Sequence, residues 1–318
     1  MRDHFIKRLT ELAAKNPKIL LITGDLGFGV FEEFARRFPK QYLNAGVAEQ
    51  NMSGLAAGLA LEGRTVFTYS IGNFPTLRCL EQIRNDICYH QADVKIVSIG
   101  GGFSYGALGF SHHATEDLSI LRALPEMTVV APGDDWEAEE ATEALARQEG
   151  PGYLRLDKSS AGHTARTGET FEIGRGRVLL EGDDFTLVST GGILGVVLEA
   201  AKKLVHEGIK CRVISLHTLK PLDTEILLKS ARETGGIMTV EENTVTGGLG
   251  GAVAEACLEG GVPPALFYRI GLRDSFATIV GSQSHLRRCY AMDEQTIVKK
   301  AIQFLGFKRK ISKKGAAL

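Results

Sequence analysis

One glutamate, Glu49, lies in an apolar stretch of the sequence, where a charged carboxylate is unexpected. It stands between an apolar, strand-like approach and the run NMSGLAAGLAL, which is typical of a buried helix. Acidic residues are favoured in a first helical turn by the exposed N–H groups and the helix dipole. Burial instead raises the pKa of a carboxyl group, and enzymes use such groups to hold or share a proton. A helix-start charge and a functional acid are therefore both open interpretations.

The bulk composition is that of a soluble globular protein with room for two domains in 318 residues. The 37 basic and 38 acidic side chains nearly cancel, which argues against nucleic acid or an acidic membrane as a partner. Basic residues cluster only at the end, in FKRKISKKGAAL, and this tail is predicted to be a solvated terminus.

Cysteine usage and hydropathy favour a cytoplasmic protein. The five cysteines are odd in number and none is spaced C-x-x-C, which argues against a disulfide framework or a zinc site. No apolar run approaches the length that crosses a bilayer. Residues 1–18 read as an amphipathic helix that contains acids, which is unlike a signal peptide.

Strand and helix patterns alternate along the chain. Strands are expected within 19–27, 64–74, 93–102, 127–133, 152–156, 184–192, 209–223 and 264–272, and helices within 77–90, 134–148 and 193–208. The segment 237–261 is expected to form a strand, a Gly-rich loop and a helix. Apolar runs that are bounded by glycine and alternate with helices indicate a parallel sheet covered on both faces. The predicted fold class is α/β, with two doubly wound, mostly parallel-sheet domains.

The segment 158–169, KSSAGHTARTGE, is polar and marks a boundary between the domains. We predict a first domain at 1–160, a linker at 161–180, a second domain at 181–308 and a basic tail at 309–318. Ligands are expected at the carboxyl ends of the parallel strands.

Several blocks resemble the transketolase family. The blocks 43–74, 80–86, 111–134 and 150–156 resemble its pyrimidine-binding domain, and LHTLKPLD, VEEN and GGLGGAVAE resemble its C-terminal domain. The resemblance runs from Arg2 to about Phe307. It implies thiamine diphosphate as the cofactor.

A full-length transketolase also has an N-terminal domain, which binds the cofactor's diphosphate through Mg²⁺ and carries a Gly-Asp-Gly motif. Only GDLG occurs here, at 24–27, and Leu26 replaces the third glycine. The chain therefore resembles the C-terminal subunit of a split transketolase. A separate N-terminal subunit is expected to bind most of the Mg²⁺, and no metal ligand is assigned to this chain. The resemblance also implies a homodimer contact through the pyrimidine domain, near Gly54 and Gly58, and a heterotetramer.

The resemblance assigns roles to four residues of the first domain. Glu49 matches the glutamate that hydrogen-bonds N1′ of the cofactor's aminopyrimidine. Phe74 matches the aromatic residue that stacks on this ring, although plain core packing is an alternative. Tyr69 is a weaker candidate for the same wall. His112 matches an active-site histidine that bonds a substrate hydroxyl or moves protons, while His113 replaces the usual glutamine and has no assigned role.

The expected substrate contacts are mixed. Arg2 and Lys158 keep basic residues that bind sugar phosphates in the family. Leu108, Gly100 and Gly29 stand where the family has an aspartate, a histidine and a serine that contact substrate. We therefore expect a substrate that is not an ordinary pentose phosphate, and the sequence leaves its donor, acceptor and phosphorylation open.

The leading functional hypothesis is transfer of a two-carbon ketol unit between sugar-type substrates. Related chemistries are the β-subunit of a 2-oxo acid dehydrogenase and a synthase of the deoxyxylulose-phosphate type. A non-catalytic regulatory subunit is a further alternative, because a fold alone does not establish a function.

Overall fold

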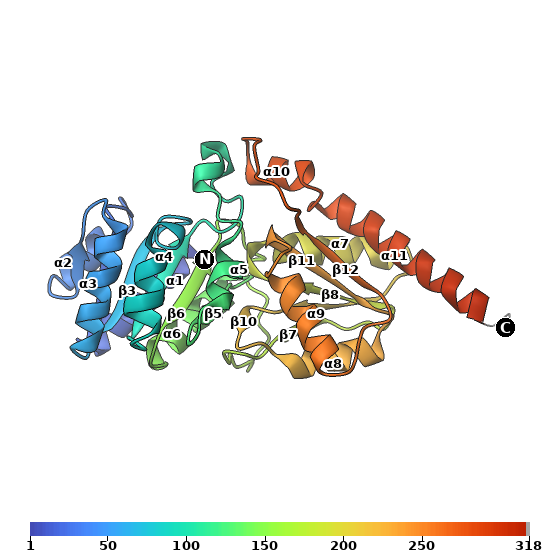
Figure 1. Cartoon of the computed structure of the whole chain (residues 1–318), viewed down its shortest axis with the longest axis horizontal. Coiled ribbons are helices and arrows are strands. Elements are labelled where there is room, and N and C mark those ends of the chain that lie inside the picture. Colours follow the sequence, from blue (N-terminus) through green and yellow to red (C-terminus); the bar gives the residue numbers. More distant parts are fainter. Residues whose placement is uncertain (316–318) are drawn as a thin grey trace.

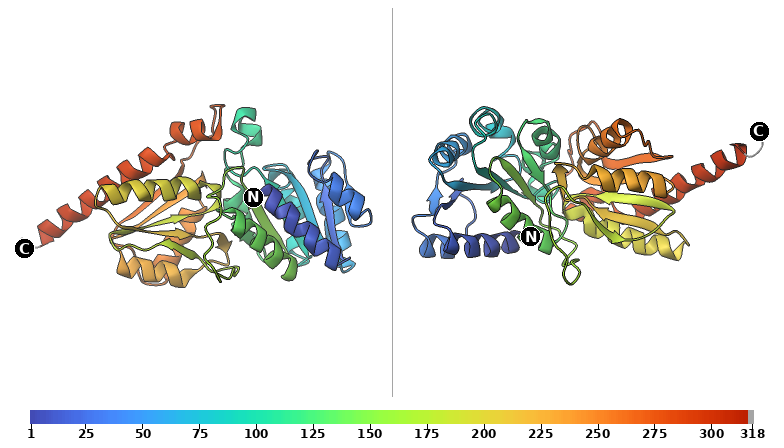
Figure 2. Two further views of the ribbon diagram at one scale, coloured as in Figure 1. Left: turned by 180° about the vertical axis from the view of Figure 1, so that it is seen from behind. Right: turned by 90° about the horizontal axis from the view of Figure 1, so that it is seen from below.

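The computed structural model describes the backbone of residues 1–315 and the side chains of residues 1–306. Two α/β units lie side by side, and each is a sheet with helices on both faces (Figure 1). The last helix, α11 (Glu294–Gly315), runs along the second unit and beyond it (Figure 2). The side chains of the predicted basic tail lie outside the described residues. Within residues 1–315, no helix is long and apolar enough to cross a membrane.

In the described part of the chain, the first sheet has seven strands in the order β10-β5-β6-β4-β3-β1-β2. These are β1 (Ile19–Thr23), β2 (Tyr42–Asn44), β3 (Thr65–Ile71), β4 (Val94–Ile99), β5 (Thr128–Val130), β6 (Gly152–Leu156) and β10 (Thr218–Lys220). Every pair is parallel except β10 with β5. Strands β1, β4 and β6 are buried on both faces, as the apolar runs predict.

Helices from distant parts of the chain cover the two faces of this sheet. They are α1 (Arg2–Lys15), α2 (Glu32–Arg37), α3 (Glu49–Leu61), α4 (Leu80–Gln82), α5 (Asp117–Ala123) and α6 (Asp135–Arg147). Helices α1 and α6 lie together on one face (Figure 2), while α3 and α5 share an apolar core on the other. The helix predicted at 77–90 is irregular, since α4 lies between a 3₁₀ turn (Leu77–Cys79) and a π-helical turn (Ile83–Cys88).

The second sheet has five strands among the described residues, in the order β12-β11-β8-β9-β7. They are β7 (Arg177–Leu180), β8 (Phe185–Ser189), β9 (Cys211–Ser215), β11 (Ile237–Thr244) and β12 (Phe267–Leu272). Its helices are α7 (Leu194–His206), α8 (Thr224–Glu233), α9 (Leu249–Glu259), α10 (Gln283–Cys289) and α11. The last four residues of the predicted linker form β7, which pairs antiparallel with β9.

Strand β10 differs from the sequence-based expectation of a strand followed by a loop over 209–223. It leaves the second unit and pairs antiparallel with β5 of the first sheet. The N–H of Ala131 also donates to the carbonyl oxygen of His217 at 2.7 Å. Leu216 and Leu219 are buried in a core cluster that also contains Val129 and Ala131 of the first unit. The two units are therefore connected both by the pairing of β10 with β5 and by the burial of these two leucines.

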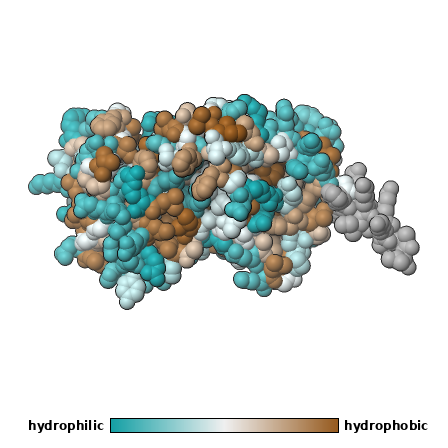
Figure 3. Space-filling model, turned by 45° about the horizontal axis from the view of Figure 1, so that its top comes forward, coloured by the Kyte–Doolittle hydropathy of each residue, from teal (hydrophilic) through white to brown (hydrophobic). Residues whose placement is uncertain are grey.

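A second junction between the units involves the loop 100–113, which follows β4. The N–H of Phe103 donates to Glu242 Oε1 of β11 at 2.6 Å, and Arg287 Nε of α10 donates to Glu242 Oε2 at 2.6 Å. On the outside of this junction, the exposed rings of Phe110 and Phe276 lie 6.4 Å apart between centroids. Figure 3 shows apolar surface at the upper edge of the molecule, on this side.

Candidate active site

The predicted site residues follow the carboxyl ends of neighbouring parallel strands. Helix α3 starts at Glu49 after β2, and Phe74 comes three residues after β3. The loop 100–113 follows β4, and Lys158 follows β6. Carboxyl ends of parallel strands meet at one edge of a sheet, which is where open α/β sheets bind ligands. The fold therefore brings these residues to a common edge.

Glu49 lies at the start of a helix and is also buried, the two features that the sequence suggests. It is the first residue of α3, and its side chain is only 2% exposed. The carboxylate accepts a hydrogen bond from Arg78 Nη1 at 2.8 Å. A buried carboxylate without a partner would be strongly destabilising, so this ion pair explains how the charge is accommodated.

Arg78 also contacts the predicted aromatic wall. Its guanidinium carbon lies 4.5 Å over the centroid of the half-buried Phe74 ring, so the cation contacts the ring while it is bonded to Glu49. The sequence analysis missed Arg78. Its position four residues after Phe74, in the turns that follow β3, is the signal that could have identified it.

His112 belongs to the same group of side chains, whereas His113 does not. The ring of His112 lies 5.2 Å from that of Phe74 in an edge-to-face arrangement, and Nδ1 is 3.1 Å from Ser111 Oγ. His113 is buried against Phe103, with ring centroids 5.4 Å apart. Burial lowers the pKa of His113, which favours its neutral form. His113 therefore acts in packing.

Tyr69 is not brought to Glu49. Neighbouring residues of a strand point to opposite faces, and a Cβ added to Gly24 would contact both Glu49 and Ser70. Tyr69 therefore faces the other way. Its buried ring is stacked on Phe5 at 6.1 Å and meets Phe31 edge-on at 4.7 Å. The structure therefore places the Tyr69 ring in the core beside Phe5 of α1 and does not bring it together with Glu49.

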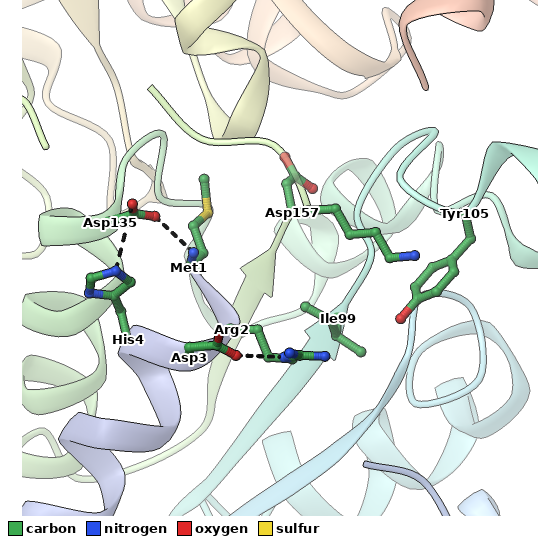
Figure 4. Close-up of a pocket in the computed structure, with 9 residues that line it drawn as sticks. Met1, Arg2, Asp3, His4, Ile99, Tyr105, Asp135 and Asp157 are labelled. Atoms are coloured by element: carbon green, nitrogen blue, oxygen red, sulfur yellow. Dashed lines mark hydrogen bonds and ion pairs between the residues drawn. The ribbon is translucent and has the colours of Figure 1, made fainter. Parts of the chain in front are cut away.

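Arg2 and Lys158 line one cavity of about 510 Å³ (Figure 4). Tyr105, from the loop after β4, forms part of its wall, and Lys158 Nζ lies 3.7 Å from the Tyr105 ring centroid. Burial and the charge of Arg2 lower the pKa of Lys158, and burial raises the pKa of Tyr105. The cavity has mixed charge, because Asp3, Asp135 and Asp157 also line it. Arg2 donates to Asp3 at 2.8 Å, which leaves Lys158, stacked over Tyr105, as the cation best placed to meet an anionic group.

The three departures from the family pattern have different surroundings. Gly100 has φ +90°, and a Cβ at this position would lie 2.1 Å from the ring of Tyr105. Tyr105 therefore occupies the space that a longer side chain at Gly100 would need. Leu108 is exposed in the loop, and nothing lies within 4 Å of a Cβ on Gly29. Neither Leu108 nor Gly29 lines the cavity.

Comparison with known proteins now decides the family. The sequence matches the model of the transketolase pyrimidine binding domain over residues 1–163 and that of the transketolase C-terminal domain over residues 174–297. The chain belongs to the transketolase family. The predicted family and the α/β fold class are confirmed.

Similar proteins support a subunit of a split transketolase-like enzyme. An apulose-4-phosphate transketolase subunit of Phocaeicola vulgatus is 35% identical, over 96% of this chain and 97% of that protein. A 6-deoxy-6-sulfo-D-fructose transketolase subunit of Clostridium sp. is also 35% identical, over 95% and 93%. A solved structure named as a split gene transketolase, an inactive β4 tetramer, has a TM-score of 0.87 and 39% identity, over 96% and 98%.

Proposed function

We propose that this chain is the C-terminal subunit of a thiamine-diphosphate-dependent transketolase that transfers a two-carbon ketol unit between sugar-type substrates. The observation that carries the proposal is the grouping of Glu49, Phe74 and His112 at one sheet edge. A buried acid, an aromatic face and a histidine are the groups that this chemistry takes from a protein.

The place between Glu49 and Phe74 fits an aminopyrimidine ring. It holds a flat guanidinium that donates to the carboxylate and lies over the phenyl ring, and an aminopyrimidine is also flat. Its N1′ differs from the guanidinium in accepting a proton that it can share with the carboxyl group. Glu49 and Phe74 would hold that half of the cofactor, and the partner subunit would hold the diphosphate and Mg²⁺. Bound there, thiamine diphosphate supplies an electron sink for breaking and forming carbon–carbon bonds.

Each residue of this chain then has a defined task. Glu49 holds a proton at N1′ of the aminopyrimidine, and its burial keeps water away from the carboxyl group. Phe74 orients the ring by stacking. His112, beside Phe74, donates to or accepts from a substrate hydroxyl.

Lys158 and Arg2 are the basic groups that could meet an anionic end group of the substrate, at a cavity that Asp3, Asp135 and Asp157 also line. The names of the two relatives carry a phosphate in one case and a sulfonate in the other. We propose an anion-tailed ketose other than the common pentose phosphates, because Tyr105 takes the space of a family histidine at Gly100.

Helix α3 supports a contact with another subunit. A Cβ on Gly54 or Gly58 would meet nothing within 4 Å in the described residues, so these glycines serve no close packing inside the described part of this chain. Leu55 and Leu61 are exposed on the same helix. We propose that a second copy or the N-terminal subunit covers this face, in a heterotetramer.

The decisive test is reconstitution with a subunit that carries the diphosphate-binding domain. We expect cofactor-dependent two-carbon transfer from a phosphorylated or sulfonated ketose, without release of CO₂. Release of CO₂ from a 2-oxo acid would point to the dehydrogenase or synthase alternative. Turnover of xylulose 5-phosphate with ribose 5-phosphate at a kcat/KM of roughly 10⁴ M⁻¹s⁻¹ or more would contradict the substrate proposal.

A further inference from the structure

We propose that Arg78 is an internal placeholder for the aminopyrimidine, and that its guanidinium must leave Glu49 and Phe74 before the ring can bind. The inference rests on the proposed function and adds a residue that opposes cofactor binding. It concerns the cofactor side of the site, which Glu49 and Phe74 define.

The geometry places Arg78 in direct competition with the ring. One guanidinium nitrogen lies 2.8 Å from Glu49 Oε2, and the guanidinium carbon lies 4.5 Å from the Phe74 ring centroid. A ring that bonds the same carboxylate and stacks on the same phenyl face needs the same volume. The two groups therefore exclude each other.

The two members of the ion pair differ in their freedom to move. The Glu49 side chain is 2% exposed, whereas that of Arg78 is 47% exposed. Within the described structure, the guanidinium has a single hydrogen-bond partner, which is Glu49. Arg78 can therefore turn into solvent and be hydrated, while Glu49 stays in place. Displacement needs only a side-chain rotation and no backbone movement.

This arrangement has opposite effects on the empty and the loaded site. Arg78 satisfies a carboxylate that would otherwise be buried alone, and so it stabilises the chain before the cofactor binds. The same ion pair must be broken on binding, and this weakens the affinity for the cofactor. Removal of the guanidinium should destabilise the empty chain and tighten cofactor binding.

The test uses the assembled two-subunit enzyme with Mg²⁺, titrated with thiamine diphosphate by calorimetry. Arg78→Met keeps much of the side-chain bulk and removes the charge. We expect it to lower the Kd about tenfold, which is the size of one net hydrogen bond to a charged group. The matched control is Arg84→Met, because Arg84 is exposed on the next turns and bonds Asn85. The control should leave the Kd unchanged.

A second measurement needs neither cofactor nor partner. Urea unfolding of the full chain is compared for Arg78→Met, Glu49→Gln and the double variant. We expect the two substitutions to be non-additive, because each removes the same ion pair. If Arg78→Met does not fold, Arg78→Gln is measured in the same two ways.

The outcomes separate the two proposals. An equal or higher Kd for Arg78→Met, or additive effects on unfolding, would overturn the placeholder role. A wild-type assembly that binds no thiamine diphosphate would overturn the proposed function and this inference with it. If Arg84→Met lowered the Kd as much as Arg78→Met, the effect would come from the loss of a positive charge at the surface. This result would also overturn the placeholder role.

Discussion

Glu49 in the first unit and Glu241 in the second are both buried glutamates next to the start of a helix, and they differ in what holds them. Glu241 accepts hydrogen bonds from the backbone N–H groups of Leu249 and Gly250, at 2.7 and 2.8 Å. These groups belong to the first turn of α9. Glu49 is held by Arg78, a side chain at the surface.

The difference separates a structural carboxylate from one that is suited to a ligand. The partners of Glu241 cannot leave without unwinding α9, so this side chain is a fixed helix cap. The partner of Glu49 can be exchanged for another hydrogen-bonding group. Burial of a charge is therefore a weak sign of function by itself. A buried charge with a replaceable partner at the carboxyl edge of a parallel sheet is a stronger one.

The largest expected effect comes from Glu49→Gln in the assembled enzyme. Glutamine has almost the same shape and still forms hydrogen bonds, but it cannot share a proton with N1′. We expect hydrogen–deuterium exchange at C2 of the cofactor to slow by about 10²–10⁴-fold, or roughly 3–5 kcal/mol at 1.36 kcal/mol per tenfold.

Glu241→Gln is the matched control for this measurement, and its C2 exchange should equal that of the wild type. Thermal melts would verify that both variants fold. Normal exchange in a well-folded Glu49→Gln enzyme would return Glu49 to the role of a helix-start charge, for which the stability effect is about 1 kcal/mol or less.

The second effect is on the pH dependence of stability. Burial raises the pKa of Glu241 to about 7, from 4.5 in the unfolded chain. Because the pKa of Glu241 is higher in the folded chain, the folded state binds the proton more tightly than the unfolded state does. The protonated side chain therefore adds to the free energy of unfolding. This stabilisation is complete below pH 4.5 and is lost as the pH rises to about 7. The loss is at most about 3 kcal/mol, at 1.36 kcal/mol per pH unit.

Glu241→Gln should abolish this contribution. Urea unfolding of the wild type and the variant at pH 5 and pH 7.5 measures it, because all other titrating groups cancel in the difference. If the difference in unfolding free energy between the wild type and Glu241→Gln did not change with pH, the pKa of Glu241 would be the same in the folded and the unfolded chain. The fixed partners would then fully offset its burial.

The smallest effect is that of Gly248→Ala, which disturbs the fixed partners directly. A Cβ at Gly248 would lie 2.1 Å from Glu241 Oε2 and 2.7 Å from Asn243 Nδ2. We expect a loss of about 2 kcal/mol of stability, as is typical of overpacking in a tight site. Gly251→Ala is the control within α9, the helix that Gly248 precedes, because its nearest neighbours are 3.7 Å away and alanine favours a helix. Equal stability of the two variants would contradict a rigid cap.

Much of the site could be predicted from residues close together in the sequence. Helical periodicity predicted α1, α6 and α7, and the apolar runs predicted the strands that carry the site. The expected position of Glu49 at the start of a buried helix agrees with the structure. These features depend on local patterns that repeat every two or 3.6 residues, which is why they could be derived without coordinates.

The remaining features depend on contacts between residues far apart in the chain. Pairing of β10 with β5 and packing of Tyr69 against Phe5, away from Glu49, both follow from packing of several elements together. The sequence by itself determined the family, the α/β class and the buried acid. The tertiary structure alone decided that Arg78 is the partner of this acid. A hydrogen bond between side chains 29 positions apart exists only after α3 and the turn that follows β3 have packed against each other.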